Sequence, residues 1–150
     1  MASVVNQIEN ASLVAFRNNS ALFPSGTTYI ARRTPSLPAG TTIPAVIVCV
    51  SEEGPTEPLA TGQKLKKYPL TVAYFTNNGH KMYDDETMRQ LRDLIERLLD
   101  DDEQTTFWTA IPGFNRCTAT GKSPYESSGL KNDLGCSLQM FTCEVIQARI

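Results

Sequence analysis

The sequence predicts an α+β fold: an antiparallel or mixed β-sheet of four to five strands, with an N-terminal helix and one central amphipathic helix packed on it. Two segments predict the sheet, because Ala45–Val50 is an unbroken apolar run and Lys66–Thr76 is rich in aromatic and β-branched residues. Apolar residues at helical spacing between Met88 and Leu99 predict the central helix. At 150 residues and 41% hydrophobic content, we expect one domain spanning 1–150, with long polar loops at about 51–65 and 121–135.

The N-terminal segment predicts the first helix. Between Ser3 and about Phe16, apolar residues recur at helical spacing, and the pattern breaks at Asn18 and Asn19. The following stretch to Thr42 contains several Gly and Pro residues. It is therefore predicted to be an irregular connection around a short strand at about 28–32.

The segment Ala45–Val50 is expected to be a strand covered on both faces, because it is too short for a comfortable helix and is dominated by β-branched residues. The polar, Pro-containing segment Ser51–Gly62 is predicted to be a mobile projecting loop. Asp84 and Asp85 are expected to cap the central helix through their side-chain oxygens.

The last third of the chain predicts further strands. Thr105–Ile111 and Asn115–Thr120 are expected to form two strands or one bent strand, interrupted at Pro112. After a polar loop at 121–135, Cys136–Arg149 is expected to be a long strand that is apolar on both faces. Short connections favour antiparallel pairing of consecutive strands.

Few residues suit catalysis or metal binding. The single histidine, His80, lies in a Gly-containing turn, and the four cysteines lack the paired spacing of zinc ligands. The segment Gly121–Ser123 lacks the upstream glycine of a phosphate-binding loop. We therefore expect no enzyme activity, no cofactor and no metal, and reduced cysteines.

The formal charge of −2 argues against general nucleic-acid binding, which needs a basic face. The first residues lack the basic and apolar regions of a secretion signal, and no window reaches the length of a membrane span. We therefore expect a soluble protein that does not recognise nucleic acid or membrane directly.

An acidic run follows the central helix. Negative charge at a helix C-terminus opposes the partial charge of the last carbonyls at about 0.3–1 kcal/mol each. A solvated, fraying helix end is one explanation. One alternative is a cation site. The other is a contact with basic residues of another subunit, in which the acidic residues Asp100, Asp101, Asp102 and Glu103 would meet the lysines Lys64, Lys66 and Lys67.

The two strands that are apolar on both faces need cover that two helices cannot fully supply. Self-association, in which a second copy of the chain covers the remaining apolar surface, is the simplest explanation. The alternative is that the irregular segment Leu22–Ile43 folds back over the second face.

In the order and spacing of its elements, the chain resembles the tail terminator (tail completion) or neck proteins of long-tailed bacteriophages. The resembling parts are the strand Tyr68–Tyr74, the helix that opens at Asp84–Met88 and runs through Leu99, and the closing strand Leu138–Val145. This family combines an N-terminal helix, an antiparallel sheet and one prominent helix after the second long strand.

The resemblance implies a structural virion protein that forms a ring, commonly of six subunits. The ring would cap the tail tube, end its polymerisation and join it to the head-neck. The implied partners are other copies of the chain, the tail tube protein and a head-completion or neck protein. The implied location is the tail-neck region of the virion, after assembly in the host cytoplasm.

On this interpretation the subunit interface is expected at Val46, Val48, Val50, Met140 and Thr142. Partner contacts are expected from the lysines and acidic residues named above and from the loop that carries Tyr125. A monomeric adaptor and a small-ligand-binding α+β domain stay open as alternatives.

Overall fold

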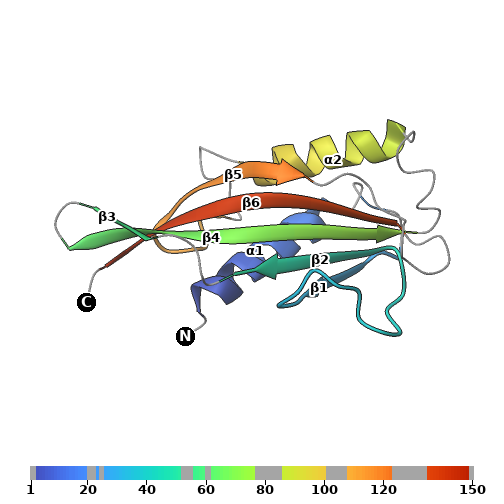
Figure 1. Cartoon of the computed structure of the whole chain (residues 1–150), viewed down its shortest axis with the longest axis horizontal. Helices are drawn as coiled ribbons and strands as arrows, with labels where there is room; N and C mark the ends of the chain where they lie inside the picture. The colour runs from blue at the N-terminus through green and yellow to red at the C-terminus, as the bar shows by residue number, and fades with distance from the viewer. Residues whose placement is uncertain are drawn as a thin grey trace.

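The computed structural model describes residues 3–19, 23, 26–51, 56–59, 62–76, 86–100, 108–122 and 135–148. The described elements follow one another in the order α1 (Val4–Asn18), β1 (Thr28–Ala31), β2 (Ala45–Val50), β3 (Thr56–Pro58), β4 (Gln63–Thr76), α2 (Glu86–Leu99), β5 (Phe114–Lys122) and β6 (Gly135–Ala148). Figure 1 shows them as one long sheet with a helix behind it and a second helix along its upper edge.

The sheet has six strands in the order β1-β2-β4-β6-β5, with β3 paired to β4. β1 pairs with β2 in parallel, and the other strand pairs are antiparallel. The predicted α+β class with a mixed sheet is confirmed. The sheet exceeds the predicted four to five strands because Thr56–Pro58, inside the predicted loop, adds a short strand to β4.

The longest ladder joins β4 and β6, each of 14 residues, from Gln63 opposite Ala148 to Thr76 opposite Gly135. Antiparallel pairing was predicted for consecutive strands with short connections, and β3 and β4 pair in this way. β4 and β5, which α2 separates along the chain, are not neighbours, because β6 lies between them. β6 matches β4 in length, so it satisfies the whole backbone of β4, which the nine-residue β5 could not.

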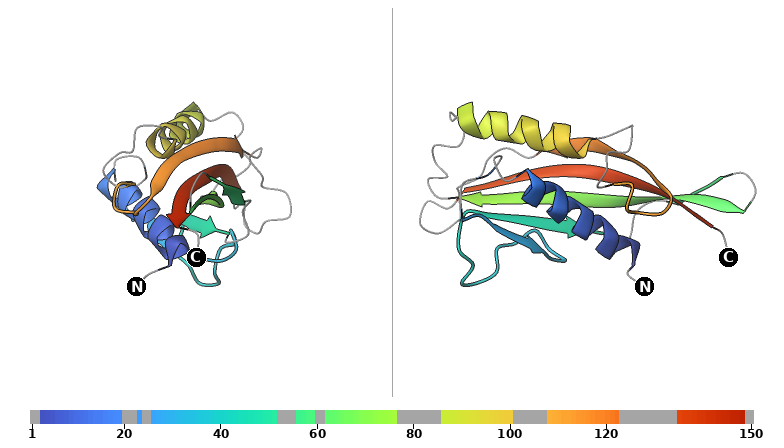
Figure 2. Two further views of the ribbon diagram at one scale, coloured as in Figure 1. Left: turned by 90° about the vertical axis from the view of Figure 1, so that its left-hand side faces the viewer. Right: turned by 180° about the vertical axis from the view of Figure 1, so that it is seen from behind.

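Side chains alternate between the two faces of the sheet, and one face is covered by both helices. We call this the helical face. Its core combines Val46 and Val48 of β2, Leu70 and Val72 of β4 and Phe141 of β6 with helix residues that include Ile8, Phe16, Ile95 and Leu99. Figure 2 shows, in its right-hand view from behind, α1 lying across this face and α2 running along the β5 side.

The first helix begins and ends through local polar contacts. Ser3 is the N-cap, and its side-chain oxygen accepts a hydrogen bond from the Asn6 amide at 3.2 Å. At the other end, the Asn19 side chain donates to the Ala15 carbonyl at 2.8 Å. The predicted helix is confirmed and runs two residues beyond Phe16, because these contacts lie at its two ends.

Two reciprocal hydrogen bonds hold α2 on β6. The buried Gln139 amide donates to the Arg92 carbonyl at 2.8 Å, and the Arg92 guanidinium donates to the Leu138 carbonyl at 3.2 Å. Asp84 and Asp85, the predicted caps of this helix, lie outside the described residues. The helix itself is confirmed over Glu86–Leu99.

The predicted strand at 105–111 is wrong where the structure describes it, because Trp108–Ala110 forms a turn. The reason is the Trp108 indole. It is fully buried, it donates to the Leu99 carbonyl at 3.2 Å, and it stacks on Phe114 with ring centroids 4.6 Å apart. The turn gives the indole this stacking partner and a carbonyl for its N–H, and an extended strand would lose both.

The second face of the sheet, which we call the open face, is covered at one end only by the residues that the structure describes. There, Leu37 and Ile43 pack against a small core of Ile47, Ala73 and Phe75. The irregular connection therefore folds back over the second face, which was the alternative to self-association. In Figure 1 the sheet is seen from this side, and no described helix crosses it.

Candidate assembly surface

Beyond the end covered by Leu37 and Ile43, the open face exposes successive cross-strand rows. β4 and β6 pair Thr71 with Met140, Pro69 with Thr142, Lys67 with Glu144 and Leu65 with Ile146. β5 extends two of these rows, since Thr118 lies opposite Thr142 and Arg116 lies opposite Glu144. This part of the sheet reaches into an arm made of β3 and the adjoining ends of β4 and β6 (Figure 1).

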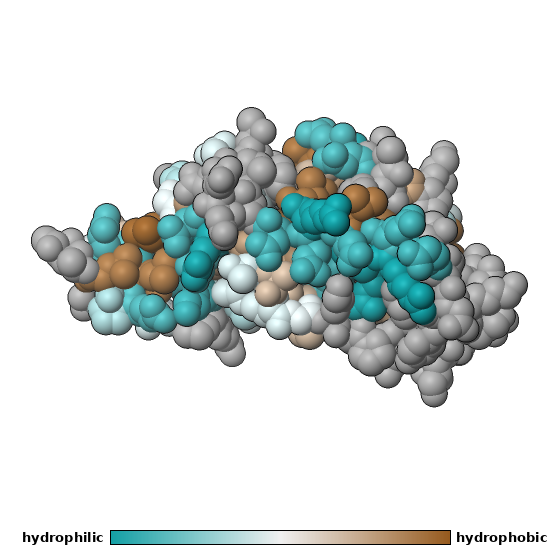
Figure 3. Space-filling view, turned by 90° about the horizontal axis from the view of Figure 1, so that it is seen from above, coloured by the Kyte–Doolittle hydropathy of each residue, from teal (hydrophilic) through white to brown (hydrophobic). Residues whose placement is uncertain are grey.

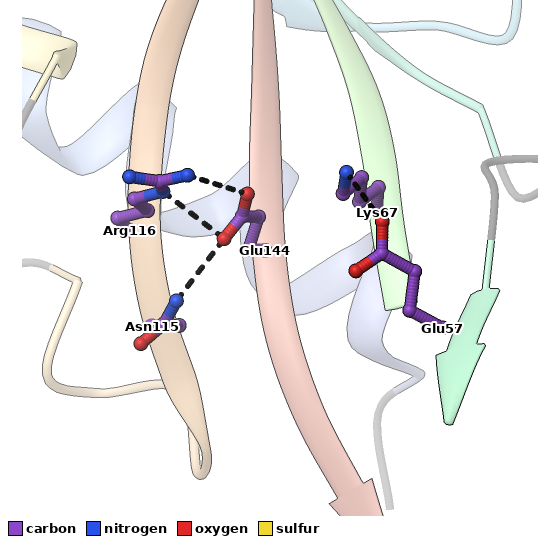
Figure 4. A network of polar contacts seen from close by, with 5 residues as sticks. All are labelled: Glu57, Lys67, Asn115, Arg116 and Glu144. Atoms are coloured by element: carbon purple, nitrogen blue, oxygen red, sulfur yellow. Dashed lines mark hydrogen bonds and ion pairs between the residues drawn. The ribbon is translucent and has the colours of Figure 1, made fainter. Parts of the chain in front are cut away.

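The middle row carries charges that alternate in sign across neighbouring strands. Lys67 Nζ lies 3.0 Å from Glu57 Oε1, and Arg116 Nε lies 3.1 Å from Glu144 Oε2. Glu57 lies opposite Leu65 in the register, and its side chain reaches diagonally to Lys67. Across β3, β4, β6 and β5 the charged groups therefore follow the order Glu57, Lys67, Glu144 and Arg116, or minus, plus, minus, plus. Figure 4 shows these side chains lying side by side, and we call them the charge row.

Within the charge row, Glu144 is the buried residue, and its carboxylate is hydrogen-bonded. Its side chain is only 8% exposed, against 51% for Arg116 and 55% for Glu57. It accepts hydrogen bonds from Asn115 Nδ2 at 3.1 Å and from Arg116 Nη2 at 3.3 Å (Figure 4). A two-pronged guanidinium contact of this kind fixes geometry as well as charge.

Apolar surface flanks the charge row on both sides. Leu65 and Ile146, which are opposite one another on the arm, are both partly exposed. On the other side, Met140 is 42% exposed. Figure 3, seen from above, shows apolar surface among polar surface at the left-hand end, where the arm projects.

The predicted interface residues divide between the two faces. Val46 and Val48 are fully buried in the core of the helical face, and Val50 is nearly so. Their assignment to a subunit interface is wrong, because α1 already covers them. Met140 and Thr142 lie on the open face and stay accessible, so they remain candidates.

Three of the predicted partner contacts, Lys66, Lys67 and Asp100, have partners within the same chain. Lys67 pairs with Glu57, and Lys66 Nζ lies 5.2 Å from the centre of the Tyr68 ring. Asp100 Oδ2 accepts a hydrogen bond from the Ala119 amide at 2.9 Å, beside a register shift in β5. This bond offsets part of the cost of a carboxylate at the end of α2.

Lys64 is half-buried on the arm, in β4. Asp101, Asp102, Glu103, Tyr125 and His80 lie outside the described residues.

A polar hollow of about 480 Å³ lies at the start of α1, lined by residues that include Glu9, Arg33 and Ser51. Burial raises the pKa of Glu9. Burial, and then the charge of Glu9, raise the pKa of the Cys49 thiol in β2, which donates a hydrogen bond to the Arg33 carbonyl at 2.9 Å. A thiol held in its protonated form is a poor nucleophile, so this arrangement does not indicate covalent chemistry.

Among the residues that the structure places, no group of three or more His, Cys, Asp or Glu side chains could hold a metal ion. No helix in the same part of the chain is long and apolar enough to cross a membrane.

Comparison with known proteins bears on the fold. No protein-family model matches the chain, and no curated protein matches its sequence. A chain of the solved structure described as "Virion of native gene transfer agent (GTA) particle" matches with a TM-score of 0.61 and 12% sequence identity. The two chains share one fold. The match covers 98% of this chain and 100% of that chain, so the fold corresponds over the whole length.

Sequence reasoning missed the charge row. Glu57 and Lys67 come from consecutive strands, but Glu144 and Arg116 lie far from them along the chain, and the strand register brings these two residues beside Lys67. A partial signal was present, since Glu144 is a charge inside an otherwise apolar strand segment, and such a residue needs a partner when it is buried.

Proposed function

We propose that this chain is a structural virion protein, without enzyme activity, that assembles into a ring, of six subunits, on the end of a tail tube. In this role it ends polymerisation of the tube and joins it to the head-neck. The observation that carries the proposal is the end-to-end fold match to a chain of a gene transfer agent virion, which the covered shares of 98% and 100% describe. The sequence resemblance to tail terminator proteins supports the finer role.

The ring would form from head-to-tail copies of one contact, because such contacts close by rotation and leave two different faces. The projecting arm suits this role. On its helical side it carries Lys64 and Lys66, which share the strand face of buried Tyr68. We place these lysines against the acidic end of α2 in the next subunit, whose described member is Asp100.

Termination would follow from the difference between the two ring faces. One face would match the tube subunits, and the other would offer no surface on which another tube ring can add. The partners on this proposal are other copies of the chain, the tail tube protein and a head-completion or neck protein. The protein would be assembled in the host cytoplasm and would remain in the tail-neck region of the virion.

The test is to add the purified protein to its tail tube protein during polymerisation and to measure tube length and end structure by negative-stain microscopy. Rings on tube ends and a fall in mean tube length are the expected results. Lys64→Glu with Lys66→Glu should weaken ring formation, and Lys64→Arg with Lys66→Arg is the matched control that keeps the charge. Unchanged tubes with bare ends would refute the proposal.

A further inference from the structure

We infer that the open face is a self-complementary docking surface, through which two copies of this chain pair about a two-fold axis that runs along the β4–β6 ladder. The occupant of this surface is therefore a second copy. The charge row and its apolar flanks carry the inference. It does not depend on the proposed ring, whose contact we place on the other side of the arm.

The order of signs makes the charge row complementary to itself. A two-fold axis that lies in the interface between β4 and β6 reverses the row in the second copy and keeps the strand direction. The row minus, plus, minus, plus then meets plus, minus, plus, minus. Lys67 faces Glu144 of the second copy, and Glu57 faces Arg116 of the second copy, so that each charge meets its opposite.

The same axis keeps the apolar flanks in register. Because a two-fold contact is isologous, the rotation that sets Lys67 against Glu144 also sets every other residue of β4 against its cross-strand partner on β6 of the second copy. Leu65 would pack against Ile146 of the second copy, and Met140 against Thr71 of the second copy, with the two Met140 side chains next to one another across the axis. The two sheets would stack face to face at about 10 Å with nearly aligned strands.

The surface suits a weak contact. Strands about 4.8 Å apart and residues about 3.4 Å apart give a patch roughly 14 Å across the strands and 20 Å along them. A patch of that size falls below the roughly 800 Å² per partner of a standard stable interface. The pairing should therefore be concentration-dependent, and it should be sought at high protein concentration.

The first experiment uses symmetric cross-linking at the axis. In a chain with Cys49→Ser and Cys136→Ser, Met140→Cys is treated with a short bis-maleimide at rising protein concentration. The matched control is Val14→Cys on α1, since Val14 is 43% exposed and Met140 is 42% exposed. We expect cross-linked dimer from the first variant and at least about tenfold less from the second. Equal yields would overturn the inference, because the two-fold contact brings the two copies of residue 140 close together across the axis and leaves residue 14, on α1, on the far side of each sheet.

The second experiment exchanges charges at the outer ends of the charge row. Glu57→Lys alone and Arg116→Glu alone each set like charges against one another in a self-paired dimer, so each should weaken self-association by about tenfold in sedimentation velocity. In an equimolar mixture of the two variants, a mixed dimer again sets each charge against a charge of opposite sign. Mixed dimers should therefore form as well as the parent dimer does. Arg116→Glu also removes the bonds to Glu144, but mixing cannot restore a lost fold, so recovery separates docking from stability.

The outcomes also separate this inference from the proposed ring. Rings on tube ends without cross-linking at position 140 would overturn the two-fold contact and leave the ring. Cross-linked dimers with full recovery on mixing, but without rings, would support the contact and refute the ring. Mixtures that stay as weakly associated as the single variants would overturn the contact.

Discussion

Arg116 and Glu144 face one another across β5 and β6, with Nε 3.1 Å from Oε2 and Nη2 3.3 Å from Oε1. The carboxylate is buried and the guanidinium is half-exposed. This asymmetry determines which partner the fold depends on. Removal of the carboxylate charge leaves a guanidinium that can turn to water, whereas removal of the guanidinium leaves a buried carboxylate with fewer donors.

Replacement of the buried carboxylate by an amide tests this network. Glu144→Gln keeps the shape but loses the charge-assisted bonds from Arg116 and Asn115, so the free energy of unfolding should fall by about 1–3 kcal/mol. The control is Glu57→Gln at the exposed end of the charge row, which should cost less than about 1 kcal/mol. Urea unfolding followed by circular dichroism measures both, and equal losses would contradict the special place of Glu144.

Position 113 requires glycine for two reasons, which are its backbone conformation and its close contact with Ile146. Its φ is +79°, and a Cβ at this position would overlap the Ile146 carbonyl oxygen, while its own carbonyl accepts from the Ile146 amide at 2.8 Å. Gly113→Ala should therefore cost clearly more than the roughly 1–2 kcal/mol of left-handed strain alone. Gly40→Ala is the control, because Gly40 has φ +77° and open space around it. Thermal melts of the two variants should differ, and equal melting temperatures would show that the contact with Ile146 is unimportant.

Trp108 ties the turn before β5 to the last residue of α2. Trp108→Phe removes the hydrogen bond to the Leu99 carbonyl but keeps a ring near Phe114, and it should cost about 1–3 kcal/mol. Trp108→Ala should cost about 3–5 kcal/mol, because it also opens a cavity. Chemical denaturation followed by far-ultraviolet circular dichroism ranks the variants. If both cost the same, the hydrogen bond rather than the ring carries the effect.

Cys49 should make stability fall at alkaline pH. Burial, and then the charge of Glu9, raise the pKa of its thiol above the ordinary value of 9.0. Above pH 9.0 the thiol of an unfolded chain ionises while the folded one keeps its proton, so unfolding releases a proton. The stabilisation is complete below that pH and is lost as pH rises through the folded pKa. Urea unfolding between pH 7 and about 10 should show a smaller fall for Cys49→Ala, and parallel curves would contradict this cause.

Because Val48 lies in the core and Met140 lies on the open face, substitutions at these two positions distinguish an effect on folding from an effect on assembly. Val48→Asp should prevent folding or cost several kcal/mol, because an unpaired carboxylate would replace a fully buried side chain. Met140→Asp on the open face should leave the melting temperature nearly unchanged and weaken only self-association. Size-exclusion chromatography with circular dichroism distinguishes the two effects. A folded Val48→Asp variant that fails only in assembly would restore Val48 to the interface.

The sequence by itself determined the elements whose signals are local. Helical spacing and capping residues lie within a few positions of one another, so α1 and α2 were predicted close to their observed bounds. The unbroken apolar run of β2 and the long closing strand were also predicted, because a strand that is buried on both faces has apolar residues at successive positions. These elements were enough to predict the α+β class.

The tertiary structure alone decided which strands are neighbours and which face each residue occupies. Strand pairing joins residues far apart in the chain, so nothing local placed β6 between β4 and β5 or aligned the charge row. Likewise, the apolar pattern of Val46 and Val48 indicated burial, but burial under a helix of the same subunit and burial under a second copy have the same pattern. The positions of α1, Leu37 and Ile43 resolved that ambiguity, because cover is a property of packing and not of any single segment.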